Sequence, residues 1–326
     1  MFRYLNLIKP GLLSNTLKKQ TLSINKYAIV RRNSTYQFSS FFNSTTFLDS
    51  NNNTNDINKE EVLLYLQSRL SSKPNLECFN EIIQDLNFLY IKESLDQEQT
   101  INLLKESLHY FGLVIKEEIN LENEILTQSS EQITTLYKSI IEILNPNIML
   151  ITLNLWKKLD PKCTKSFLNF NEFLLTRTKF MNLFEGKQIV NLLQAYYEVR
   201  NKLESDKFAY IFDKCDTFIC SKKDLVFQKE EVAQLLYLYS KCNLGSDNFY
   251  HKLFRNFTEE KDKMSLDDLV TCYWSIVSYN ISKKDKKYIV YQQDVHEKIL
   301  KNIKSLNSFQ TKQFLWAYQM EKIIFP

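Results

Sequence analysis

Glycine and proline are scarce in this chain, with four and five copies in 326 residues. Turn-rich β folds and low-complexity chains use many more of these residues. Their scarcity therefore predicts helices joined by short polar loops. In addition, no segment alternates polar and apolar residues for long enough to require a strand. The sequence predicts an all-α fold without a sheet.

The shortage of glycine also removes several catalytic motifs. The sequence contains no GxGxxG motif, no phosphate-binding P-loop and no GxSxG nucleophile elbow. Adjacent carboxylates such as Glu117 and Glu118 would point about 100° apart on a helix, which suits a solvated face. We therefore expect no enzyme activity, no cofactor and no small-molecule substrate.

Closely spaced metal ligands are also missing. The chain has only three histidines, each isolated, and none of its six cysteines forms a CxxC pair. A zinc site needs paired ligands at short spacing. We expect no metal site and instead buried free thiols, as suits a reducing compartment. The cysteines are Cys78, Cys163, Cys215, Cys220, Cys242 and Cys272.

No apolar run is long enough to span a membrane. The longest, residues 140–156, is interrupted by Glu142, Pro146 and several asparagines. A spanning helix requires roughly 18–20 apolar residues. We expect no transmembrane helix, which leaves peripheral membrane association open.

Acidic residues are absent from the first 48 positions, which hold seven basic ones. Apolar residues such as Leu13, Leu17 and Ile24 recur at helical spacing, and the segment is rich in serine, threonine and asparagine. A basic, acid-free amphipathic helix is typical of a mitochondrial presequence. We expect a presequence over residues 1–40, import to the matrix or the matrix face of the inner membrane, and an asparagine-rich linker over 41–58. An ordinary surface helix or a disordered tail is the alternative.

The net charge of +4 comes from this leader. Without its seven basic residues, 35 basic and 38 acidic residues remain, a net charge of −3. Residues 49–160 hold 9 basic and 18 acidic residues (net −9), and residues 161–326 hold 26 and 20 (net +6). Attraction to phosphate is therefore expected only in the carboxyl-terminal half. We expect an acidic helical region over 59–180 that docks proteins, and a mildly basic region over 181–326.

Apolar residues from Lys59 onward follow a period close to 3.6. Pro74 should separate the first two helices, Gly112 should close a third helix near its end, and Asn145-Pro146 should end a helix that reaches Leu144.

Residues 181–326 contain a repeat. Four segments share apolar residues at the spacing of one helix face, and the pattern advances by 43, 37 and 42 residues. A second amphipathic helix separates each pair, and Ser246 and Ser265 are placed to cap helices. Such a hairpin cannot bury its own apolar face, so it stacks on its neighbours. The sequence predicts α-solenoid-like stacked helical hairpins of about 37–43 residues. The first three segments begin at Ile189, Val232 and Leu269, and Phe314 of the fourth segment corresponds to Cys272 of the third.

Three of these segments show a leucine pair or a similar apolar pair with neighbouring aromatic residues: residues 192–197, 235–241 and 314–318. They resemble the first-helix core of octotricopeptide-type repeats, as found in FAST kinase domain proteins and their RAP-domain relatives. The chain shows no recognisable RAP domain. The resemblance implies a helical-repeat protein of mitochondria or plastids that acts in RNA maturation, RNA stability or ribosome function.

Exposed basic and aromatic residues of the last repeats are the candidate RNA contacts. Lysine and arginine can pair with phosphate, and aromatic rings can stack on bases. Solubility for the cations and packing between hairpins for the rings are the alternatives. The candidate phosphate contacts are Lys241, Lys252, Arg255, Lys283, Lys284, Lys286, Lys287, Lys301 and Lys304, and the candidate stacking residues are Tyr237, Trp274 and Trp316.

Together these features indicate a non-catalytic helical-repeat scaffold of a larger mitochondrial assembly. The expected setting involves RNA, either as a mitoribosomal accessory subunit or as a transcript-maturation factor. The alternative is an accessory structural subunit of a respiratory-chain or ATP synthase complex.

Overall fold

The structure is a computed structural model that describes residues 59–117, 122–160, 164–283 and 289–324. In these ranges the chain forms fourteen α-helices and three short 3-10 helices, with no strand, which confirms the predicted all-α fold. The leader and linker expected over residues 1–58 lie outside the described ranges. The helices are α2 (Lys59–Leu70), α3 (Leu76–Ile91), α4 (Gln97–Glu117), α5 (Asn123–Ser139), α6 (Pro146–Trp156), α7 (Lys165–Leu175), α8 (Thr178–Met181), α9 (Gly186–Val199), η1 (Arg200–Lys202), α10 (Ser205–Ser221), α11 (Lys229–Cys242), α12 (Asp247–Glu260), η2 (Lys261–Lys263), α13 (Leu266–Lys283), α14 (Ile289–Lys301), η3 (Ile303–Ser305) and α15 (Ser308–Ile324).

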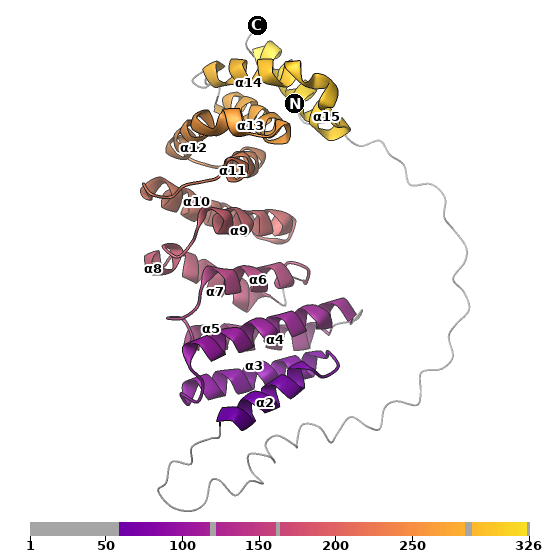
Figure 1. Cartoon of the computed structure of the whole chain (residues 1–326), viewed down its shortest axis with the longest axis vertical. Coiled ribbons are helices and arrows are strands. Elements are labelled where there is room, and N and C mark those ends of the chain that lie inside the picture. The colour runs from indigo at the N-terminus through magenta and orange to yellow at the C-terminus, as the bar shows by residue number, and fades with distance from the viewer. Residues whose placement is uncertain (1–58, 118–121, 161–163, 284–288, 325–326) are drawn as a thin grey trace, which may run out of the picture. The chain divides into compact units, whose positions relative to one another are not determined.

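The helices of residues 58–326 form two layers of stacked hairpins (Figure 1). In the first layer, α2, α4, α6, α9, α11, α13 and α15 each pack on the next. In the second layer, α3, α5, α7, α10 and α12 do the same, and α14 packs on its hairpin partner α13. This arrangement confirms the stacked helical hairpins expected from the repeat. No described helix combines the length and the apolar character needed to cross a membrane.

The stack continues past residue 180, where the sequence divides an acidic region from the repeats. Residues 58–326 form one compact unit. Across that point α6 packs on α9, and α7 packs on α10. The acidic helices are therefore built like the repeats that follow them.

The α11–α12 hairpin shows why these residues form this unit. The apolar stripe of α11, including Leu235, Leu236 and Tyr239, is fully buried. The helix begins with a capping box between Gln228 and Glu231 and ends where Asn243 adopts a left-handed conformation. Gly245 then takes a φ of +99°, and the Ser246 hydroxyl accepts a hydrogen bond from the Phe249 amide to cap α12, as predicted.

An aromatic chain joins successive hairpins in the core. The ring centroids of Phe79 and Phe111 lie 4.4 Å apart, and those of Phe111 and Trp156 lie 5.0 Å apart. Phe167 extends the chain, 6.4 Å from Trp156. These rings come from α3, α4, α6 and α7 in turn. Burial of each one contributes roughly 2–3 kcal/mol, so the hairpins depend on one another for stability.

Two predicted helix ends were wrong. Gly112 lies inside α4, which continues to Glu117. A Cβ at this position would approach Leu155 Cδ2 to 3.3 Å, so the glycine permits close packing of α4 on α6. The helix expected to reach Leu144 ends at Ser139, and Asn145 instead caps the start of α6. Asparagine before proline favours a helix start as much as a helix stop.

Candidate functional site

The three predicted stacking residues lie next to one another on the first layer. Tyr237 on α11 and Trp274 on α13 have ring centroids 5.5 Å apart. Trp316 on α15 follows at 5.7 Å from Trp274. We call these three side chains the aromatic row. They meet because α11, α13 and α15 stack directly, and the rings stand at related positions of successive repeats.

The aromatic row is partly buried and partly open. Tyr237 and Trp274 are half-buried and pack against the core, while Trp316 keeps 40% of its surface exposed. Adjacent rings are tilted by 46° and 39°, so each covers part of its neighbour. The rings therefore fill the seams between helices, and Trp316 also presents an aromatic surface.

A cation lies over the middle of the row. The Lys241 ammonium is 5.4 Å from the centre of the Trp274 ring, a cation–π contact. Lys241 is in the last turn of α11, where a positive charge also favours the helix dipole. Its side chain is exposed. Among the six predicted phosphate contacts that the structure describes, Lys241 is the one whose side chain lies over the aromatic row.

Tyr197 at the end of α9 and Arg200 at the start of η1 extend this surface, and neither was predicted from the sequence. The Arg200 guanidinium lies 4.0 Å from the Tyr197 ring centre and donates to the Tyr197 carbonyl at 2.8 Å. Burial raises the pKa of Tyr237, the nearby Tyr197 adds to the rise, and Arg200 opposes it. In the sequence, the signal that could have identified this pair is an aromatic residue followed by an arginine three positions later, close to the repeat motif.

Two predicted phosphate contacts belong to the second layer and already have protein partners. The Lys252 ammonium on α12 donates to the carbonyls of Ile219, at 2.6 Å, and of Lys222. It therefore caps the end of α10, and its partial burial lowers its pKa, with Cys220 opposing. Arg255 pairs with Glu259 one turn away, at 3.2 Å.

The other candidates are spread over different places. Lys283 ends α13, 3.4 Å from the Asp247 carboxylate. Lys301 ends α14 and Lys304 lies in η3, at the opposite end of α14 from the α13–α14 connection. Three more lie outside the described residues: Lys284, Lys286 and Lys287. The described cations therefore lie on several different elements: α11, α12, α13, α14 and η3.

A polar cluster between α10 and α12 links two hairpins. The buried Asp216 carboxylate accepts from the Ser246 amide at 2.6 Å and from the Ser246 hydroxyl at 2.9 Å. The Cys220 thiol donates to the same carboxylate at 3.3 Å. Burial and this hydrogen bond raise the pKa of Cys220 to about 11, so the thiol stays protonated at neutral pH.

The other described cysteines also lie wholly or partly in the interior. Cys78, Cys215 and Cys272 are buried and free, and Cys242 is half-buried. Burial raises the pKa of Cys215 to about 12. The described residues contain no group of three histidine, cysteine, aspartate or glutamate side chains that could hold a metal ion.

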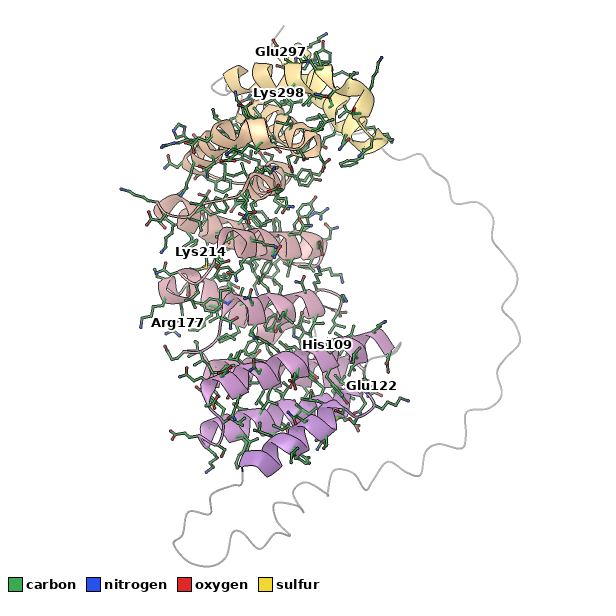
Figure 2. All side chains as sticks on the ribbon, in the orientation of Figure 1. His109, Glu122, Arg177, Lys214, Glu297 and Lys298 are labelled. Carbon is green, nitrogen blue, oxygen red and sulfur yellow. The ribbon has the colours of Figure 1, made fainter. Side chains whose placement is uncertain are left out.

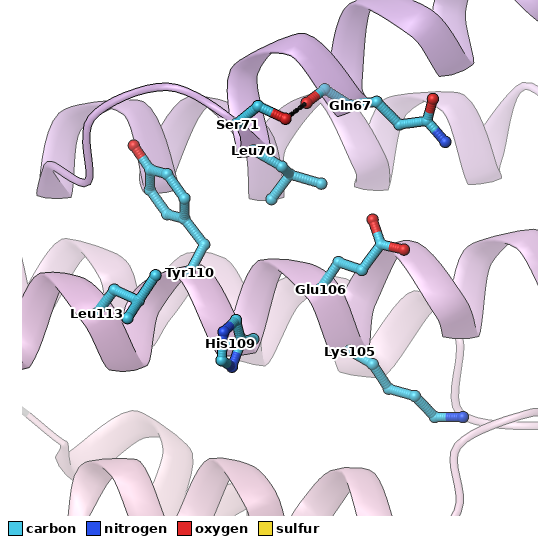
Figure 3. Close-up of a pocket in the computed structure, with 8 residues that line it drawn as sticks. All are labelled: Gln67, Leu70, Ser71, Lys105, Glu106, His109, Tyr110 and Leu113. Atoms are coloured by element: carbon cyan, nitrogen blue, oxygen red, sulfur yellow. Dashed lines mark hydrogen bonds between the residues drawn. The ribbon is translucent and has the colours of Figure 1, made fainter.

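An open groove of about 620 Å³ lies between α2 and α4 (Figure 3). Its lining includes Lys105, Glu106 and His109 from α4 and Gln67 and Ser71 from the end of α2. Glu106 extends from α4 toward α2 in Figure 3. The groove offers one acid, one base and one imidazole in an open setting, which is a weaker recognition surface than the aromatic row.

No protein-family model matches this chain, and no curated protein sequence matches it.

Proposed function

We propose that this chain is a non-catalytic helical-repeat scaffold of the mitochondrial matrix that binds single-stranded RNA along its aromatic row. Its setting would be a mitoribosomal accessory subunit or a transcript-maturation factor. The observation that supports the proposal is the contiguity of Tyr237, Trp274 and Trp316 across three stacked helices, with Lys241 over Trp274.

Stacking on such rings suits RNA without demanding a particular sequence. Every base has a π face, and base–aromatic stacking contributes about 1–3 kcal/mol per base. The exposed part of Trp316 and the outer edges of the row offer such a surface. Lys241 and Arg200, each held over a ring, can reach backbone phosphates beside it.

The charge of the surface sets an expected salt dependence. Residues 59–326 hold 35 basic and 36 acidic residues, so non-specific attraction to phosphate is weak. Two phosphate contacts, from Lys241 and Arg200, predict that log K falls with log salt at a slope of about −1.4. A much steeper slope would indicate a larger basic surface elsewhere.

Fluorescence anisotropy of the full chain with a labelled single-stranded oligouridine tests the proposal. The double substitution Trp274→Ala and Trp316→Ala should weaken binding about tenfold or more, because it removes two stacking faces. Lys241→Gln, at an exposed position, should weaken binding and make the salt slope shallower.

Phe173→Ala is the matched control. Phe173 is an exposed aromatic residue of the second layer with a cation, Arg177, 5.3 Å from its ring centre. Arg177 is labelled in Figure 2. Its loss should leave RNA binding unchanged. Equal affinities for wild type, the double variant and Lys241→Gln, with melting temperatures preserved, would contradict the proposal.

The proposed compartment rests on the sequence of residues 1–40. This segment fused to a fluorescent protein should direct it to mitochondria. Replacement of Arg31 and Arg32 together with Lys18 and Lys19 by glutamine should abolish import, because the membrane potential no longer draws the segment inward. A fusion that stays in the cytosol with the unaltered segment would contradict matrix import.

A second candidate function is an accessory structural subunit of a respiratory-chain or ATP synthase complex. The near balance of charge over residues 59–326 favours contacts with proteins over contacts with RNA. A group of exposed apolar side chains near α15 also favours contacts with proteins. Retention of RNA binding by the isolated protein discriminates between the two.

A further inference from the structure

Exposed apolar side chains concentrate at one end of the stack. Thirteen large apolar residues are exposed among the described residues, and six of them lie between positions 300 and 323. Single exposed apolar residues are normal on any protein, whereas a contiguous group marks an interaction surface. The six, with exposed fractions from 40% to 71%, are Leu300, Ile303, Phe309, Leu315, Trp316 and Ile323.

Helix α15 carries apolar residues on two opposite faces. One face buries Phe314 and Ala317, with α13 as the packing partner. The opposite face carries Phe309, Leu315 and Ile323, which are 65%, 44% and 71% exposed. Each first-layer helix from α4 to α13 lies between two other first-layer helices and packs on both. Among the described helices, α15 has such a neighbour only in α13 (Figure 1).

The charge around this face is mainly positive. Residues 295–323 hold five lysines and two acidic residues. One of the acids, Glu321, is bound to the Tyr273 hydroxyl, and Lys298 pairs with Asp262. The exposed lysines Lys301 and Lys304 lie just before α15, Lys322 lies near its end, and Lys312 lies among the apolar residues, three positions from both Phe309 and Leu315.

We propose that the outer face of α15, defined by Phe309, Lys312, Leu315 and Ile323, docks an amphipathic helix of a partner protein whose apolar stripe is flanked by acidic residues. A helix fits because every helix of this layer that is covered on both sides is covered by other helices. Acidic flanks complement the lysines that surround the face. This inference stands independently of RNA binding.

Binding of designed peptides to the full chain tests this surface. The probe is a labelled helical peptide of 17 residues, the length of α15, with leucine at i, i+3, i+4 and i+7 and glutamate beside the stripe. A second peptide keeps the stripe and carries lysine in place of glutamate. The glutamate peptide should bind about tenfold or more tightly than the lysine peptide, with the difference shrinking at high salt.

Substitutions on the exposed face should not disturb the fold. Leu315→Asp with Ile323→Asp should weaken binding of the glutamate peptide about tenfold or more, since it places charge in the apolar stripe. Val226→Asp is the control, at an apolar residue that is 81% exposed before α11, and should leave binding unchanged.

Three results would overturn the inference. They are equal affinity for both peptides, no effect of the paired aspartates, and concentration-dependent dimers that the paired aspartates abolish, which would assign the face to a second copy of the chain. The outcome is separable from the proposed function, because Trp274→Ala and Lys241→Gln should each weaken oligouridine binding and leave binding of the glutamate peptide intact.

Discussion

The Asp85 carboxylate on α3 loses solvation on folding, and its protein contacts replace only part of that solvation. Its Oδ2 atom accepts no hydrogen bond from a described residue. Burial raises its pKa from 3.8 to about 6, and the positive charge of Arg69 opposes only part of the rise. Folding therefore favours the protonated acid. The cost of the charged form grows as pH rises from about 4 to about 6 and stays constant above that.

Asp85→Asn should for this reason stabilise the protein at high pH. The expected gain at pH 8 is up to about 3 kcal/mol, which corresponds to about two pKa units. The gain should fall toward zero near pH 4, where the native carboxyl is protonated. Urea unfolding of both proteins between pH 4 and pH 8 measures the difference, with Glu131→Gln on the exposed face of α5 as the control. A gain that does not change with pH would contradict this explanation.

The roles of single residues were only partly predictable from the sequence. Tyr237, Trp274 and Trp316 could be selected because they recur at related positions of a repeat, and repeats stack in register. The role of Lys252 could not be predicted, because its ammonium reaches carbonyls of Ile219 and Lys222 that only packing of α12 on α10 brings near. Charge in a sequence window does not say whether a cation already has a partner.

Gly245 controls the geometry of the α11–α12 hairpin. Its φ of +99° lies in the region that other residues rarely adopt, and an added Cβ would lie 2.9 Å from Tyr250 Cε2 and 3.0 Å from Tyr239 Cδ1. Both rings are fully buried, so they have little room to move.

Gly245→Ala should therefore destabilise the protein by about 2–4 kcal/mol, from backbone strain together with overpacking. Asn243→Gly in the same turn is the matched control. Asn243 also has a positive φ, of 55°, so glycine there relieves strain and the change should be small. Chemical denaturation measures both variants. Equal effects at the two positions would show that the turn tolerates a side chain at residue 245.

Helix positions followed well from the sequence, and helix ends followed less well. Apolar periodicity located the first helices of the repeats because each buries one continuous stripe. Gly112 was misplaced as a helix end because its role depends on Leu155 in a neighbouring helix, which lies 43 residues further on. Asn145 was misread because a proline after an asparagine serves either end of a helix.

Most contacts in the stack join neighbouring hairpins. A destabilising substitution should therefore affect mainly the helices around it. Helices pack on their neighbours within the two layers, and hairpin contacts join α3 with α4, α9 with α10, α11 with α12 and α13 with α14. Stability in such an array is approximately a sum of unit and neighbour terms.

Ile83→Ala, at a fully buried position of α3, tests this property. The cavity should cost about 2–5 kcal/mol. Hydrogen exchange should accelerate in α3, α4 and α5 and remain unchanged in α13 and α15. Exchange measured by mass spectrometry under native conditions would show the gradient. Equal acceleration throughout residues 59–324 would mean that the stack unfolds only as one unit.

At the scale of the molecule, we propose a protein that is imported into mitochondria, binds RNA along its aromatic row and binds a partner protein at α15. Sedimentation after gentle lysis of mitochondria, with and without ribonuclease, tests the central claim of this proposal most directly. If the protein binds RNA as proposed, it should migrate with an RNA-containing particle and lose that migration after ribonuclease. The double variant Trp274→Ala with Trp316→Ala should show reduced migration. Migration with a membrane complex that is indifferent to ribonuclease and to these substitutions would contradict the proposal.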